Sequence, residues 1–146
     1  MALTDPLAKP EWSPVDPEVQ EALVSLLVPI SVRGTTLTEK VGFNASMAAL
    51  ESYLHGGPKV AAVFVARSDL SAIECLPLAL ACVAGSVKLA ALPQGASDRL
   101  NTGIMAITED SQESAVIRLA KDLSPPKLDW VYNAAEMQKK SKTNKK

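Results

Sequence analysis

The chain has 146 residues, of which 47% are hydrophobic and only 4% aromatic, and its formal net charge is −1. This length suits one domain with a core of its own, built from Ala, Val, Leu and Ile rather than from aromatic rings. No segment approaches the ~20 apolar residues of a membrane span, and no apolar run opens the chain as in a signal peptide, so we expect a soluble intracellular protein without a membrane partner.

The first predicted elements are a flexible lead-in and a helix. Residues 1–15 are rich in Pro and show no periodicity. Asp16-Pro17-Glu18 is typical of a helix start, with an Asp cap, a proline at the first helical position and an acid in the first turn. Apolar residues then recur at helical spacing until Pro29, where we expect the helix to end. Gly34 and three threonines indicate a loop.

A second helical pattern places Val41, Met47, Leu50 and Leu54 on one face, and a Gly-Gly-Pro sequence after His55 ends it. Three continuous apolar runs then follow, as is typical of strands covered on both faces. These runs are residues 59–66, 87–92 and 104–108. Further helices are predicted at 73–85, from about 95, and at 113–123, and residues 128–132 are either a last strand or an extended edge.

This alternation of buried strands and helices implies a central sheet with helices on both faces. We therefore predict an α/β fold, a three-layer α/β/α sandwich around a mixed sheet of about four strands, over residues 16–133. Residues 134–146 form a basic tail. The last eight residues hold five of the 15 basic residues and no acid, which leaves ten basic and 16 acidic residues, a net charge of −6, elsewhere.

The charge distribution limits how the chain could bind nucleic acid. A lysine run such as this tail either stays solvated or serves as a nuclear address or a non-specific attraction to nucleic acid, and both interpretations stay open. A body with a net charge of −6 excludes a surface that is basic all over. Any RNA would therefore be bound through a local patch.

Residues that could carry catalysis or hold a metal are few. Cys75 and Cys82 share one helical face, too far apart for a disulfide, and we interpret them as small core hydrophobes in a reducing compartment. His55 is the only histidine, so neither a Cys/His zinc site nor a catalytic triad is predicted. Glu109-Asp110 fits a cap and first-turn charge of the next helix. No glycine-rich phosphate or nucleophile motif is present. We expect no enzyme, no metal and no cofactor.

Three segments together resemble a known family: VGFNASMAALESYL (41–54), VFVARSDLSAIECLPLALAC (63–82) and LAALPQGASDRL (89–100). In order and spacing they resemble the superfamily of kink-turn RNA-binding ribosomal and small nucleolar RNP proteins, over roughly residues 17–132. Within it, the chain looks most like the Pop-three-type subunit of nuclear ribonuclease P and RNase MRP, with LPQGASDRL and DWVYNAA as the supporting segments. The resemblance implies an α/β/α sandwich with no catalytic centre of its own.

In that superfamily a Gly-x-Asn-Glu-x-x-Lys motif opens a helix and reads the sheared base pairs of a kink-turn. Gly42, Phe43 and Asn44 match its beginning, whereas Ala45 and Ala48 stand where Glu and Lys are usual. A helix N-terminus offers free N–H groups, and an Asn side chain offers a donor and an acceptor to a base edge. The missing Glu and Lys remove contacts worth ~1–3 kcal/mol each, which favours docking beside other subunits with modest RNA contact.

The ends of the predicted strands supply the other candidates, because binding residues of such sheets gather where strands end and helices begin. Arg67 and Arg99 are phosphate candidates, and Ser68 and Asp69 are expected to cap the following helix. Asn101-Thr102-Gly103 corresponds to a shortened form of the family's base-closing loop, and Lys40 can substitute for the missing lysine. The RNA-binding candidates are Lys40, Gly42, Phe43, Asn44, Arg67, Gln94, Gly95, Arg99, Asn101 and Thr102.

The expected function is that of a non-catalytic RNA-binding subunit of nuclear ribonuclease P and RNase MRP, which supports tRNA 5′-end and rRNA processing. Its partners would be structured RNA and other protein subunits, and its location the nucleus and nucleolus. A ribosomal or snoRNP kink-turn-binding protein and a protein-binding adaptor on the same fold stay open as alternatives, and a small α/β enzyme is the least favoured class. The expectation requires the entrance of the Gly42 helix to lie beside Arg67 and Arg99.

Overall fold

The computed structural model of the protein describes residues 10–128. Its sheet has four strands in the order β2-β5-β3-β4, with β3 parallel to β4 and β5 antiparallel to its neighbours, and β1 pairs separately with β6. The elements, in chain order, are β1 (Pro10–Glu11), α1 (Pro17–Arg33), β2 (Glu39–Val41), α2 (Phe43–Leu54), β3 (Val60–Val65), a 3₁₀ turn (Arg67–Asp69), α3 (Ala72–Gly85), β4 (Lys88–Ala91), α4 (Ala96–Leu100), β5 (Ile104–Thr108), α5 (Ser114–Lys121) and β6 (Lys127–Leu128).

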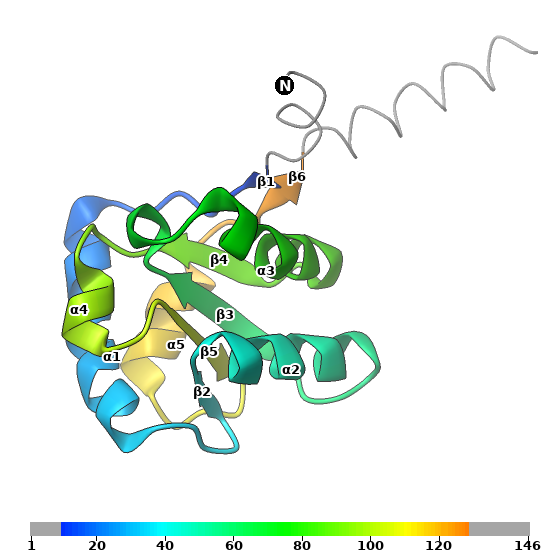
Figure 1. The fold of residues 1–146 in the computed structure, drawn as a ribbon. Helices are drawn as coiled ribbons and strands as arrows, with labels where there is room; N and C mark the ends of the chain where they lie inside the picture. Colours follow the sequence, from blue (N-terminus) through cyan, green and yellow to red (C-terminus); the bar gives the residue numbers. More distant parts are fainter. Residues whose placement is uncertain (1–9, 129–146) are drawn as a thin grey trace, which may run out of the picture.

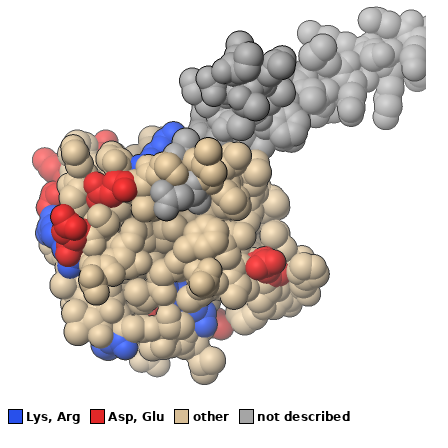
Figure 2. Space-filling model, viewed as in Figure 1, with Lys and Arg blue, Asp and Glu red and all other residues tan. Residues whose placement is uncertain are grey.

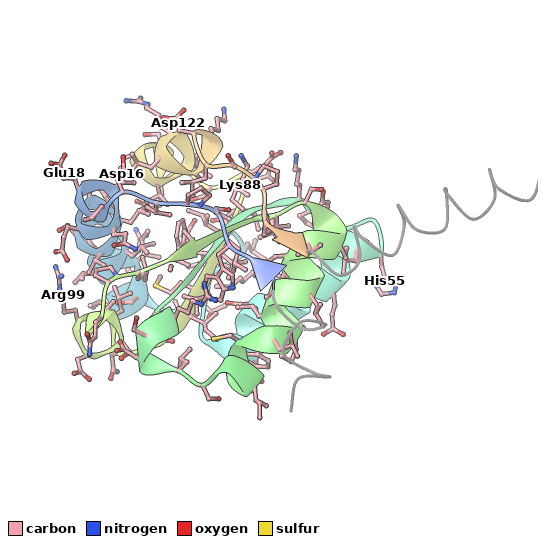
Figure 3. All side chains as sticks on the ribbon, turned by 90° about the horizontal axis from the view of Figure 1, so that it is seen from above. Asp16, Glu18, His55, Lys88, Arg99 and Asp122 are labelled. Atoms are coloured by element: carbon pink, nitrogen blue, oxygen red, sulfur yellow. The ribbon has the colours of Figure 1, made fainter. Side chains whose placement is uncertain are left out.

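Helices cover both faces of this sheet, which confirms the predicted α/β/α sandwich (Figures 1 and 3). Successive side chains of a strand point to opposite faces, and β3 supplies both cores in this way. Ala62 and Phe64 pack with α1, α4 and α5, whereas Val63 and Val65 pack with α2 and α3. The three runs predicted as strands, 59–66, 87–92 and 104–108, contain β3, β4 and β5.

The first helix begins at Pro17 as predicted, with Asp16 at the cap position, but the Asp16 side chain makes no capping hydrogen bond. The helix does not end at Pro29. It continues to Arg33, and Gly34 closes it with an N–H that donates to the carbonyls of Ile30 and Ser31. Pro29 lies on the exposed side of α1, where water can satisfy the carbonyl that loses its intrahelical partner. Burial of Leu27 and Ile30 against the sheet continues on either side of the proline and holds the helix together.

The fourth strand of the sheet is β2, which the sequence did not indicate. Val41 lies in this strand and not on the face of the second helix, so its place in the predicted helical pattern was wrong. Of residues 128–132, only Leu128 is described; it belongs to β6 and pairs with β1 outside the main sheet, and the rest lie outside the described residues. The acidic pair Glu109-Asp110 lies in the turn ahead of α5, and the residue at the cap position is Glu113.

The end of the predicted flexible lead-in packs on the domain. Ser13 is buried, its N–H donates to the carbonyl of Leu89 at 2.9 Å, and its hydroxyl accepts from the N–H of Leu89 at 3.0 Å. These bonds tie the segment to β4 through an isolated parallel bridge. Residues 12 and 13 therefore differ from the flexible segment that their composition predicts, because Trp12 packs against the core and Ser13 bonds to the backbone of the outer strand β4.

Both cysteines are buried, as predicted, and neither forms a disulfide; burial raises the pKa of the Cys82 thiol to about 12. Cys82 is therefore protonated at neutral pH and packs as an apolar side chain. Within residues 10–128, no helix is long and apolar enough to cross a membrane. In the same part of the chain, no three His, Cys, Asp or Glu side chains gather in a way that could hold a metal ion.

Candidate nucleic-acid interface

The entrance of α2 presents an uncapped helix N-terminus. Gly42 precedes the helix with φ 98°, a left-handed conformation that favours glycine, and its carbonyl accepts the first helical bond from the N–H of Ser46. Among the described residues, no side chain caps this end and no acid lies in its first turn. Phe43 and Asn44 are exposed there. The free N–H groups of a first turn and an exposed amide side chain are thus available to a ligand.

The loop that precedes β5 lies directly beside this entrance. The Gly42 N–H donates to the carbonyl of Ile104, and the Ala66 N–H donates to the carbonyl of Gly103, both at 2.8 Å. Within the loop, the Thr102 hydroxyl donates to the carbonyl of Ile104, and Asn101 is exposed with φ 56°. Two backbone bonds therefore join the start of α2 to the first residue of β5, and the loop before β5 to the residue that follows β3, at one end of the sheet.

A groove with a volume of about 360 Å³ opens between these segments and the start of α3. Its lining is mostly apolar, and one of the lining side chains, Ile73, is 83% exposed. Gly103 packs closely against Leu70 in the groove lining, because a Cβ on residue 103 would lie 3.1 Å from Leu70 Cδ1. The lining residues are Phe43, Leu70, Ile73, Pro77, Thr102, Gly103 and Ile104.

Asp69 fixes the neighbouring turn. Its carboxylate accepts hydrogen bonds from the N–H of Gly95 at 3.1 Å, and from the N–H and the hydroxyl of Ser97 at 3.2 and 2.8 Å. The bond from Gly95 contributes most to holding the pKa of this carboxyl below its ordinary value, and the two from Ser97 add to it. Asp69 therefore caps α4 and not the following helix as predicted, since the parallel pairing of β3 and β4 brings the two turns together.

The positively charged candidates are held by other protein groups. The Arg67 guanidinium lies 4.4 Å from the ring centre of Trp12, which is a cation–π geometry. Arg99 pairs with Glu21 of α1 at 2.9 Å, and Figure 3 shows it at the α1 side of the molecule. The Lys40 ammonium donates to the carbonyl of Thr36 at 2.7 Å. Arg99 thus belongs to the layer opposite α2 and α3, apart from the groove. The expected position of Arg99 beside the entrance of the Gly42 helix is therefore wrong.

The face drawn in Figure 2 is largely uncharged. It carries α4 and the beginnings of α2 and α3 (Figure 1), and its acidic and basic side chains gather mostly at one margin. The structure brings Gly42, Phe43 and Thr102 together at the groove, and Asp69 ties Gly95 to the end of β3. Gln94 is exposed in the same turn. The interface is therefore polar through backbone and amide groups and not through a cluster of cations.

Sequence reasoning missed the apolar lining from α3 and a buried acid in β2. Ile73 and Pro77 fall in the helix predicted at 73–85, and Leu70 lies just before it. The exposure of Ile73 and Pro77 distinguishes these two from core residues. Glu39 is 7% exposed and accepts bonds from the hydroxyls of Thr36, Thr38 and Ser111. No charge pattern in the sequence signals this network.

The Glu39 network joins the end of α1, β2 and the segment before α5. Arg33 lies 3.8 Å from Glu39 and 2.7 Å from Glu113. Partial burial raises the pKa of the Glu39 carboxyl, but the hydrogen bonds and Arg33 outweigh it, so the pKa lies below its ordinary value. A carboxylate that accepts three hydroxyl bonds and lies beside Arg33 holds these elements in place. We assign it to the fold.

Comparisons with protein-family models, with curated proteins and with solved structures found no significant match to this chain.

Proposed function

We propose that this chain is a non-catalytic RNA-binding subunit of a ribonucleoprotein, of the kind found in nuclear ribonuclease P and RNase MRP. In that role it would support tRNA 5′-end and rRNA processing in the nucleus and nucleolus, with structured RNA and other protein subunits as its partners. The proposal rests on the motif resemblance of residues 41–100 and on one structural observation. That observation is the hydrogen bond between the Gly42 helix entrance and Ile104, the residue that follows the loop at 101–103, and it does not involve Arg99.

This contact supports the proposal because the resemblance requires two separate segments to act on one RNA. The motif at Gly42–Asn44 would read paired bases, and the loop at 101–103 would close on an unpaired base. The two segments are about sixty residues apart in the sequence, yet the bond from Gly42 to Ile104 makes them neighbours. RNA proteins commonly bind unstacked bases by stacking and edge contacts, and the groove offers an exposed ring, Phe43, beside a free amide, Asn44.

A second function is favoured by the character of the groove. Its lining is apolar, Ile73 is 83% exposed, and the surrounding face carries few charges. Large exposed apolar side chains gathered in one place are typical of protein-binding surfaces. A protein-binding adaptor on the same fold, with the RNA held mainly by its neighbours, is therefore the alternative. A ribosomal or snoRNP kink-turn protein would share the RNA-binding prediction and differ only in the complex.

Binding to RNA by the purified full chain tests the first function. A kink-turn RNA and a plain duplex of equal length would be compared across a series of salt concentrations, because phosphate contacts alone do not discriminate between them. We expect a preference for the kink-turn that Asn44→Ala reduces and Gln112→Ala, which removes an exposed amide far along the chain, does not. Equal affinity for the two RNAs would favour the adaptor.

Co-purification decides the complex. Ribonuclease P RNA recovered with the tagged full chain from nuclear extract, in excess over ribosomal and snoRNP RNAs, is the expected result. Recovery of ribosomal or small nucleolar RNA instead would retain the RNA-binding role and replace the complex. Recovery of proteins without any of these RNAs would point to the adaptor.

A further inference from the structure

Three lysines surround a small cavity at the end of β3 that lies away from the groove. The cavity has a volume of about 80 Å³ and is placed where β3 and β4 begin, where β5 ends and where α5 crosses the sheet. Its polar lining consists of Lys59, Lys88, Lys121, Glu109 and Ser86, and its apolar lining of Val60, Ala61, Ile117 and Ala120. Figure 3 shows Lys88 in this region, close to α5.

The charges of these lysines are only partly matched. Lys59 pairs with Glu109 at 3.3 Å, and both side chains are about half exposed, so the pair is weak. The Lys88 ammonium donates to the carbonyl of Leu123, which is an uncharged acceptor and not an acid. Lys121 forms no ion pair with any described residue. Asp122 follows Lys121 but does not line the cavity. Three cations therefore face one acid on a body whose other charges sum to an excess of acid.

Ser86 adds a hydroxyl to this lining at a backbone position where glycine is usual. It follows α3 with φ 53°, and its N–H donates to the carbonyl of Val83. Left-handed residues at the end of a helix are most often glycine, because any Cβ is strained there. The serine hydroxyl is the feature that a glycine would not supply to the cavity.

We propose that this cavity binds a phosphate group, held by the ammonium groups of Lys59, Lys88 and Lys121 and by the Ser86 hydroxyl. Lysine is a common phosphate ligand, and 80 Å³ is several times the ~10–15 Å³ that a cavity needs on this measure to hold one water, which leaves room for one small oxyanion. The group could belong to free phosphate or to an RNA backbone. The site does not depend on the proposed function, because the six residues of β3 place it roughly 20 Å from the groove.

A titration with inorganic phosphate tests the site. Backbone amide signals of the full chain would be followed by NMR, with chloride at matched ionic strength as the reference. We expect saturable shifts at residues 59–61, 86–88 and 117–121. Lys121→Gln should weaken phosphate binding about fivefold, whereas Arg118→Gln, which removes the same charge from an exposed position on the same helix, should leave it unchanged. Equal effects of both variants, or shifts spread over the whole surface, would overturn the proposal.

Ser86→Gly separates a binding role from a structural one. The glycine relieves backbone strain, so the midpoint of thermal unfolding should rise while the affinity for phosphate falls. Unchanged affinity in both Ser86→Gly and Lys121→Gln would overturn the site. The salt dependence of RNA binding identifies the source of the phosphate. If the site binds an RNA phosphate, Lys121→Gln lowers the slope of log K for RNA binding against log salt concentration by about one. An unchanged slope, with the phosphate titration weakened, assigns the site to the free ion.

Discussion

The two ends of β3 carry surfaces of opposite character. At the Val65 end, the start of α2, the loop at 101–103 and the start of α3 enclose an apolar groove with free amide groups. At the Val60 end, a smaller cavity is lined by three lysines. The first suits a flat, weakly charged group such as a base or an apolar side chain, and the second suits a small anion.

This difference separates the exposed apolar lining from the lysine cluster by the length of β3. Arg67 and Arg99, which the sequence offered as phosphate ligands beside the groove, are engaged by Trp12 and Glu21. The least neutralised cluster of cations described above lies at the other end of the sheet. A partner that touched both ends would span the length of β3. Substitutions can therefore remove one surface, the other, or both.

The largest effect is expected from the shared strand. Phe64 lies at the centre of β3 with no exposed surface, so Phe64→Ala should reduce the free energy of unfolding by about 3–5 kcal/mol. Urea denaturation measures this loss. Phe43→Ala, at the 40% exposed ring of the groove, is the matched control and should cost well under half as much. Similar losses for the two phenylalanines would mean that the groove is part of the core.

Asn44→Ala should act on RNA binding alone. Loss of a bidentate amide contact to a base edge lowers affinity roughly 10- to 100-fold, while the exposed position leaves stability within about 0.5 kcal/mol. Filter binding with a kink-turn RNA measures the first quantity and thermal unfolding the second. An unchanged affinity for the kink-turn RNA would remove this residue, and with it the motif, from the interface.

Ile73→Ser distinguishes a groove that binds protein from one that binds RNA. Ile73 is 83% exposed at the groove and Val32 is 81% exposed at the end of α1, so Val32→Ser is a control of nearly equal exposure. If the groove docks a protein subunit, Ile73→Ser should weaken association by about tenfold and Val32→Ser should not. Quantitative pull-down from reconstituted complex measures the ratio. Equal behaviour of the two variants would exclude the groove as a docking surface.

The smallest effect is expected from the carboxylate of Asp69. Its pKa is lowered from 3.8 chiefly by the Gly95 N–H, and also by Ser97. A group with a lowered folded-state pKa stabilises the fold above its unfolded value and loses that contribution as pH falls through the folded value. Asp69→Asn should therefore lower the unfolding midpoint at pH 7 and flatten its decline below about pH 4. An unfolding midpoint that fell with decreasing pH as steeply in Asp69→Asn as in the parent protein would contradict this role.

The sequence predicted the layers of this fold better than its edges. The strands at 59–66, 87–92 and 104–108 are buried on both faces, and continuous apolar runs report such burial directly. β2 has three residues, Glu39, Lys40 and Val41, whose pattern is not that of a strand. Pairing with β5 and hydrogen bonds to Glu39 hold these three residues in the sheet. Tertiary contacts of this kind leave no local signal.

The candidate site was predictable in its positions and not in its partners. The family resemblance predicted a helix start at Gly42 and a loop at 101–103, and the structure brings them together. The capping of α4 by Asp69 requires the parallel alignment of β3 with β4, and the pairing of Arg99 requires α4 to pack on α1. Both depend on contacts between residues at least 26 positions apart, which no pattern in a single segment encodes.

The bonds between Ser13 and Leu89 have a consequence for how the protein meets other chains. β4 and β2 are the outer strands of the sheet, and an open outer strand invites pairing with a foreign backbone. The chain closes part of β4 with its own Ser13, and β2 has only three residues. Proteolytic removal of residues 1–13 would expose the backbone of β4, the longer of the two outer strands. Self-association through β4 should then increase with protein concentration.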